Sequence, residues 1–307
     1  MVEVPASTGT AGSAGFAAMP GRHRHHALAA AELVADGSIE FSAGAPEDID
    51  AAREWLPFGT PVFVPVLPLH SMDSRIALMR VLREAGFDPV PHIAARRVSS
   101  RAQLQDFLAA AVEAGAVHRV LLIGGDSAGV AGPYPEAAAV LRDGVLGNAG
   151  IREVGLAGYP EGHPKLPGEA MEAALLEKLE LAAGQGLGAQ VITQFSFVPT
   201  RIISWCTRLA GLAPEIPVYV GLAGPASVRQ LVHYARYCGV AASLSAVSKV
   251  GVKLAQLASH AQADEQLGLL ASFNAAHEAS NIIGIHVFSF GGFSTTARWM
   301  HAHLNST

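Results

Sequence analysis

Residues 151–165 read IREVGLAGYPEGHPK and join an apolar run to a loop of reactive side chains. The run over 151–157 predicts a buried strand, and the two prolines and two glycines after it prevent a helix or a strand from continuing. An acid, an imidazole and an ammonium group, those of Glu161, His163 and Lys165, are thereby displayed where the strand ends. In α/β proteins, ligands bind at the C-terminal ends of the strands. The stretch therefore predicts either a ligand-binding loop of such a fold or an ordinary turn rich in Gly and Pro.

The same succession of an apolar run and an amphipathic segment recurs on both sides of this stretch. Apolar runs predict strands at 38–42, 61–66, 89–95, 117–123, 151–157, 189–195, 216–222 and 282–288. Helical spacing covers 27–35, 72–85, 101–114, 135–146, 168–183, 199–210, 226–237, 243–274 and 295–304. Eight strand-then-helix units predict an α/β fold of the single (β/α)8 TIM barrel type. The alternative, an open doubly wound sheet, would normally carry G-x-G-x-x-G after an early strand, and the sequence lacks this motif.

The size and composition of the chain allow one large domain. It has 307 residues, of which 50% are hydrophobic and 15% are charged, so it can bury a large core. Residues 27–307 contain no internal repeat or low-complexity block, and we expect them to form one catalytic barrel. Residues 1–26 are expected to be a disordered tail, because they are rich in small residues and lack the charged start and continuous apolar core of a secretion signal.

Composition also excludes several partners. No stretch approaches the roughly 18 uninterrupted apolar residues of a membrane span, so no membrane partner is predicted. The two cysteines, Cys206 and Cys238, cannot build a disulfide framework and fit a reducing cytoplasm, where we expect the protein to work. A net charge of −5 offers no basic field for a phosphate backbone, so nucleic acid is not predicted as a partner. Small molecules are the expected ligands.

Two further kinds of chemistry find little support in the sequence. Glu161 and His163 lie two residues apart, and His301 and His303 repeat that spacing, but no third ligand is evident and no metal is predicted. A Ser-His-Asp hydrolase of the α/β type would carry a G-x-S-x-G elbow, which is absent from the sequence.

Polar side chains collect at the C-terminal ends of the predicted strands, which all open on one face of a barrel. Each has a structural explanation when taken alone: an acid can pair with a buried arginine, an imidazole can be a satisfied core residue, and Asp126 can cap the next helix. Together they favour a site for a flat heteroaromatic ligand with a phosphate arm, in which the loop amides after Gly124 and Gly125 meet the phosphate. The residues expected to converge there are Glu40, His92, Asp126, Tyr159, His163, Gln194 and His286.

At these positions the chain resembles methylenetetrahydrofolate reductases. The most specific match is AGYPEGHP at 157–164, followed by ITQF at 192–195 and the Gly125-Asp126 turn. Weaker matches are IEF at 39–41, Pro91-His92, and HVF at 286–288. The matches occur in the family's order from about Glu40 to Phe288, and on them the chain is identified as a divergent member of the family.

The resemblance implies a barrel that binds FAD and passes hydride from NAD(P)H, through the flavin, to methylenetetrahydrofolate, giving 5-methyltetrahydrofolate or running in reverse in one-carbon catabolism. It implies that Glu40 and Asp126 are catalytic. Glu40 would protonate the folate as its five-membered ring opens, and an acid buried in an apolar strand suits this role because burial disfavours the charged form. Asp126 would stabilise the cationic iminium.

The resemblance also assigns binding residues. Gln194 and Phe195 would bind the substrate, a tetrahydrofolate derivative. The cofactor would be held by His92, Gly124, Gly125, Asp126, Tyr159, His163 and Lys178. The expected partners are the folate and a nicotinamide nucleotide, and Ala-rich helix faces would allow a homo-oligomer.

Two departures from the family pattern leave alternatives open. Gly124 stands where the family has the arginine of Arg-Gly-Asp, so a cation that would meet the flavin's phosphates is lost. The family's Glu-Phe-Phe-Pro-Pro is EFSAG at 40–44. Lys165, Lys178 or Arg96 would then meet the pyrophosphate, or NAD(P)H would reduce the folate directly without a flavin. Two readings from other classes are a folate-binding barrel that transfers a methyl group and a non-catalytic subunit.

Overall fold

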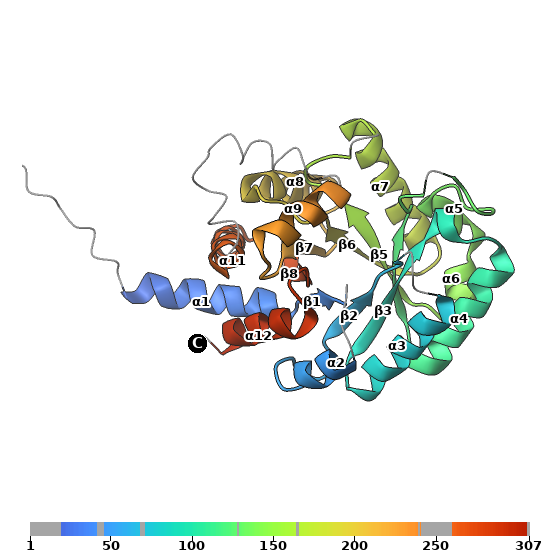
Figure 1. Ribbon diagram of the computed structural model, residues 1–307. Coiled ribbons are helices and arrows are strands. Elements are labelled where there is room, and N and C mark those ends of the chain that lie inside the picture. The colour runs from blue at the N-terminus through green and yellow to red at the C-terminus, as the bar shows by residue number, and fades with distance from the viewer. Residues whose placement is uncertain are drawn as a thin grey trace, which may run out of the picture.

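Eight parallel strands form a closed barrel in the computed structural model, which describes residues 20–41, 46–67, 71–127, 129–163, 166–238, 240 and 260–305. Each strand pairs with the next along the chain, and β8 pairs with β1 to close the barrel (Figure 1). The predicted α/β class and single (β/α)8 barrel are thus confirmed. The strands are β1 Ser38–Glu40, β2 Pro61–Val64, β3 Asp88–Ala94, β4 Arg119–Ile123, β5 Glu153–Gly158, β6 Gly188–Thr193, β7 Val218–Ala223 and β8 Ile282–Phe288.

Helices surround the barrel on its outer side, and most of them follow the strand predicted to precede them (Figure 1). The helix expected over 135–146 is divided into α5 and α6, because Gly144 adopts a left-handed φ of 69° between them. The helices are α1 Pro20–Ala35, α2 Pro46–Ala52, α3 Met72–Glu84, α4 Arg101–Gly115, α5 Ala137–Asp143, α6 Val145–Asn148, α7 Gly168–Gly184, α8 Pro199–Leu212, α9 Val228–Tyr237, α11 His260–Ala276 and α12 Phe293–Leu304.

The ends of the chain differ in detail from the prediction. Helix α1 begins at Pro20, seven residues before the predicted helix at 27, and packs against α11 and α12. Residues 1–19 and 241–259 lie outside the described residues, so the disordered tail over 1–19 and the helix over 243–259 stay predictions. Within the described part of the chain, no helix is both long and apolar enough to cross a membrane.

The barrel interior is filled by side chains from alternate positions of the strands, as expected for parallel strands closed on themselves. Phe63, Val90, Leu121 and Ile192 come from four different strands and form a buried cluster of their own. The Phe63 ring lies against the ring of His286, with 4.5 Å between the centroids. This apolar layer forms a floor beneath the polar groups at the C-terminal ends of the strands.

Helix α9 lies over the ends of β6, β7 and β8, because an aromatic cluster fastens it there. Tyr234 of α9 stacks on Phe290, with 4.1 Å between the ring centroids, and Phe290 packs edge-on against Phe195. Phe197 and Phe288 complete the cluster. The cluster therefore narrows the opening of the barrel on the side of β6 to β8.

Candidate active site

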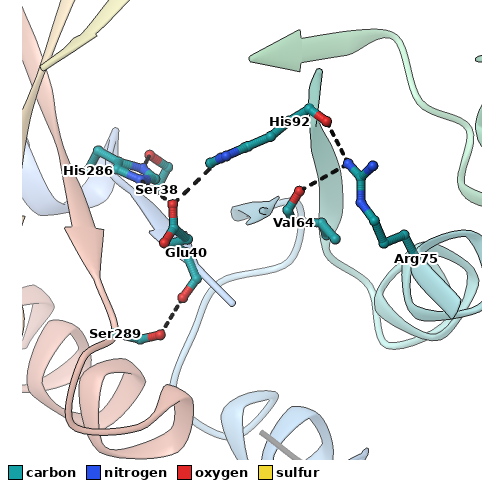
Figure 2. Close-up of polar contacts among 7 residues, drawn as sticks. All are labelled: Ser38, Glu40, Val64, Arg75, His92, His286 and Ser289. Carbon is teal, nitrogen blue, oxygen red and sulfur yellow. Dashed lines mark hydrogen bonds and ion pairs between the residues drawn. The ribbon is translucent and has the colours of Figure 1, made fainter. Parts of the chain in front are cut away.

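Glu40 stands at the end of β1 and faces two imidazoles from other strands (Figure 2). Its Oε2 lies 3.6 Å from Nε2 of His92 on β3 and 4.0 Å from Nε2 of His286 on β8. All three residues are buried. The three side chains predicted from strands far apart in the sequence therefore meet at one point of the barrel mouth.

The ring of His92 is neutral in this environment. Burial, which has the largest effect, lowers the pKa of His92 to about 4; the charges of His286 and Arg75 act in the same direction, and the Glu40 carboxylate opposes them. Nε2 of His92 is buried and has no hydrogen-bond partner among the described residues. A buried polar atom without a hydrogen-bond partner, beside Glu40, can bind a polar ligand or a bridging water.

His286 is held by a residue that the sequence analysis missed. Ser38 Oγ lies 2.8 Å from Nδ1 of His286, and the two residues are paired in the register of β1 and β8. Nε2 of His286 has no hydrogen-bond partner in the described structure, on the side that faces Glu40. Ser38 precedes Glu40 by two residues, so strand alternation alone would have placed both on the inner face.

Two arginines of the site were also missed. Arg75, in the first turn of α3, donates from Nη2 to the backbone carbonyl of His92 at 2.6 Å. It lies at helical spacing from the buried Met79 and Leu82, and this position on an apolar face was the available signal. Arg97, just after β3, binds the Asp126 carboxylate from Nη2 at 2.9 Å. Arg97 thus places a cation beside the turn that contains Gly124 and Asp126.

The turn after β4 is open to a ligand. Gly125 adopts a φ of 88°, and a side chain at Gly124 would meet no atom within 4 Å. Asp126 follows them, with 59% of its side chain exposed. The three predicted residues therefore form an accessible loop rather than part of the buried cluster around Glu40.

Cys238 connects the two regions. Burial, the largest effect, together with the nearby carboxylates of Glu40 and Asp126, raises the pKa of the Cys238 thiol to about 12. Cys238 follows α9, and its backbone carbonyl accepts a hydrogen bond of 2.5 Å from Nε2 of Gln194. Both carboxylates therefore lie within electrostatic reach of the end of α9, over the barrel mouth.

The two residues expected to bind substrate lie in different environments. Gln194 follows β6 and is partly buried, with its amide held by Cys238. Phe195 is 1% exposed and is covered by the aromatic cluster, including Phe197 and Phe290. A contact of Phe195 with a pterin would require this cluster to open, so its predicted role finds no exposed face in the described structure.

The loop after β5 carries two packed rings. Tyr159 and His163 meet edge-on with 5.5 Å between the ring centroids, and burial raises the pKa of the Tyr159 phenol. Glu161 accepts a hydrogen bond from the Ser196 hydroxyl, which ties the loop to the segment after β6. A cavity of about 250 Å³ lies beside the loop, between α7 and α8, and includes Trp205 in its lining.

Lys178 is placed apart from the cluster around Glu40. It lies in the middle of α7, where burial lowers the pKa of its ammonium group while Glu136 and Glu177 oppose that shift. The charged groups that act on Lys178 are therefore Glu177 of α7 and Glu136, which precedes α5, and not those of the cluster around Glu40. Lys165, the other lysine suggested for the pyrophosphate, lies outside the described residues. Arg96, the third candidate, donates from Nε to the carbonyl of Pro135.

Among the described residues, no group of three or more His, Cys, Asp and Glu side chains is arranged to hold a metal ion. The closed parallel barrel makes this a protein of the TIM-barrel class, and the acid and imidazoles at the C-terminal strand ends form a polar site at its mouth. A family model described as methylenetetrahydrofolate reductase matches residues 69–250, more than half of the chain. The chain belongs to the methylenetetrahydrofolate reductase family.

Individual relatives are distant. Methylenetetrahydrofolate reductase 2 of Saccharomyces cerevisiae is 33% identical over 69 residues, which cover 22% of this chain and 11% of the yeast protein. A solved structure from Clostridium thermocellum, of an uncharacterized protein that binds two copies of 5-methyl-5,6,7,8-tetrahydrofolic acid, has a TM-score of 0.56 at 11% identity. That comparison covers 87% of this chain and 94% of the other, and at this identity it supports the fold alone.

Proposed function

We propose that the chain reduces 5,10-methylenetetrahydrofolate to 5-methyltetrahydrofolate with hydride from NAD(P)H, and that FAD mediates the transfer. The observation that carries the proposal is the buried carboxyl of Glu40 between two imidazoles at the mouth of a barrel of this family. Ring opening of the substrate requires a proton donor, and Glu40 is the acid that the site offers.

The neighbours of Glu40 suit a proton donor. His92 is neutral near pH 7, so it brings no positive charge to the carboxyl 3.6 Å away. The Ser289 hydroxyl donates to the backbone carbonyl of Glu40 and steadies the end of β1 (Figure 2). Glu40 would deliver its proton to the folate nitrogen that leaves the five-membered ring, and Asp126 would stabilise the cation formed by ring opening.

The residues at the mouth fit a flavin nucleotide. The open turn at Gly124 and Gly125 presents backbone amides, and Arg97 supplies a cation beside them, which is the donor set that phosphates require. Nε2 of His92 is a buried polar atom without a hydrogen-bond partner among the described residues, available to a ring edge. When bound, FAD supplies a carrier that accepts hydride from NAD(P)H and gives it to the folate.

Direct hydride transfer from NAD(P)H to the folate is the second candidate. The ion pair between Arg97 and Asp126 favours this candidate. Arg97 already binds a carboxylate at 2.9 Å, so its charge is less available to the phosphates of a flavin. The two candidates differ in a simple observable. A flavoprotein is yellow as purified, whereas a colourless protein that oxidises NADH only when methylenetetrahydrofolate is present would support direct transfer.

The acid role is tested with Glu40→Gln, which keeps the shape of the side chain and removes its proton. We expect the turnover of methylenetetrahydrofolate to fall at least about 100-fold while the affinity for 5-methyltetrahydrofolate stays close to that of the wild type. Glu47→Gln, on the exposed face of α2, is the matched control and should keep full activity. Normal folate turnover by Glu40→Gln would show that Glu40 is not the proton donor.

A further inference from the structure

Arg75 is a buried cation without an anionic partner among the described residues. Its side chain lies at the start of α3 and is 4% exposed. Burial lowers the pKa of its guanidinium to about 10, so the group remains charged near neutral pH. Its polar and ring contacts among the described residues are with two backbone carbonyls and with the ring of Phe107, whose centroid lies 4.8 Å from Cζ of Arg75.

A charge buried in this way is costly, since backbone carbonyls and a ring face replace only part of its hydration. Nε of Arg75 is also left without a hydrogen-bond partner in the described structure. These costs point to a role for the guanidinium that a hydrophobic side chain at this position could not fill.

The guanidinium holds the C-terminal ends of two neighbouring strands. Nη2 of Arg75 donates to the carbonyl of His92 on β3 at 2.6 Å and approaches the carbonyl of Val64 on β2 at 3.4 Å. Figure 2 shows Arg75 on one side of β3 and the His92 ring on the other, pointing toward Glu40. The hydrogen bond therefore fixes the backbone from which the His92 side chain projects.

We propose that Arg75 is a positioning residue for the acid Glu40 and acts through His92: its guanidinium anchors β3 so that the His92 ring faces Glu40, and it places a fixed positive charge behind that ring. The catalytic consequence rests on the proposed function. In the proposed function the Glu40–His92 pair holds one proton, and a more basic His92 ring, 3.6 Å away, would take a larger share of that proton from the Glu40 carboxyl. An enzyme without the Arg75 charge would therefore have less of the protonated Glu40 that donates to the folate.

The charged and titratable groups around His92 come from several elements. Glu40 of β1 favours protonation of the His92 ring, while His286 of β8 and Arg75 of α3 oppose it, in addition to the larger effect of burial. Tyr234 of α9 and Cys238 after it lie within electrostatic reach of Glu40. Among these neighbours Arg75 is the fixed positive charge, and it can be removed without touching the inner face of the barrel.

The test is a histidine titration by NMR on the full chain, with ¹³C-labelled imidazoles and the His92 signal assigned by its loss in His92→Gln. Three variants are compared with the wild type. Arg75→Gln keeps donors for the carbonyls and removes the charge, Arg75→Lys keeps a charge, and Arg80→Gln removes an exposed charge from the same helix as the control.

We expect His92 of the wild type to titrate well below the ordinary value of about 6.5, and Arg75→Gln to raise its midpoint by about half a pH unit, roughly a threefold change in the protonation equilibrium, because burial remains the larger effect. Arg75→Lys and Arg80→Gln should stay near the wild type. The kcat for methylenetetrahydrofolate should fall in Arg75→Gln only, together with the rise of the His92 midpoint.

A wild-type His92 that titrates near 6.5, or a folded Arg75→Gln variant with the wild-type midpoint, would overturn the proposal. If Arg75→Gln does not fold, the wild-type titration and Arg75→Lys still decide, since an Arg75→Lys midpoint raised toward 6.5 would contradict the role of the charge. The titration needs no folate or nucleotide. If Arg75→Gln raises the His92 midpoint but the wild type has no reductase activity, the role of Arg75 toward His92 stands. The proposed function would then be overturned instead.

Discussion

His92 links the chemistry of the site to the stability of the fold. Its pKa is about 4 in the folded protein, mainly because of burial, and about 6.5 in an unfolded chain. The unfolded state therefore binds more protons between these values, and the free energy of unfolding falls as the pH is lowered through this window. The loss from His92 alone should reach about 3 kcal/mol by about pH 4.

Urea unfolding at a series of pH values checks this prediction. His92→Gln cannot take up the proton, so its free energy of unfolding should lose the part of the acid dependence that comes from His92. His277→Gln changes an exposed imidazole and should keep the wild-type dependence. An acid dependence that is the same in His92→Gln and in the wild type would show that folding does not lower the pKa of His92.

The candidate site could be predicted from the sequence to the extent that its residues lie on or next to strands. Glu40, His92 and His286 end or line strands, and strand ends converge in a barrel. Arg75 and Arg97 could not be placed in the same way. Their long side chains reach the site from a helix and a loop, and the direction in which such a side chain extends depends on packing that sequence spacing does not specify.

At the scale of elements, the aromatic cluster determines where α9 lies. Phe290 is 5% exposed and contacts Tyr234 of α9 face to face and Phe195 edge-on. Removing the ring should leave a cavity and loosen the packing of α9 on β8. We expect Phe290→Ala to lower the free energy of unfolding by about 3 kcal/mol.

Hydrogen exchange and chemical unfolding test this prediction together. Amides of α9 should exchange faster in Phe290→Ala, and the exchange in α3 and α4, on the other side of the barrel, should change less. Phe58→Ala removes an aromatic ring that is 88% exposed and should change the stability by less than about 0.5 kcal/mol. If α9 stayed as protected in Phe290→Ala as in the wild type, the cluster would not be what holds it.

At the scale of the whole molecule, closure of the barrel by β1 and β8 brings its first and last strands together. A ligand that binds the mouth contacts elements from the entire chain, so its binding should stabilise the whole fold. We expect 5-methyltetrahydrofolate, at a hundred times its Kd, to raise the free energy of unfolding by about 2.7 kcal/mol.

Thermal or chemical unfolding with and without the folate measures this effect, and p-aminobenzoylglutamate, which lacks the pterin, is the control ligand. Stabilisation by the folate and not by the control would favour pterin recognition at the mouth. If neither the folate nor NADH stabilised the protein, the chain would be better described as a non-catalytic subunit of this family.

The sequence by itself determined the barrel, because eight apolar runs with amphipathic segments between them can bury their surfaces in few other ways. It also determined which acid and imidazoles face the mouth, since these positions follow from strand ends and from alternation along a strand. Only the tertiary structure decided that Phe195 is covered, that Lys178 lies away from Glu40 and that Arg75 stands behind His92. These outcomes depend on contacts between elements distant in the chain, whose geometry is set by side-chain packing rather than by local periodicity.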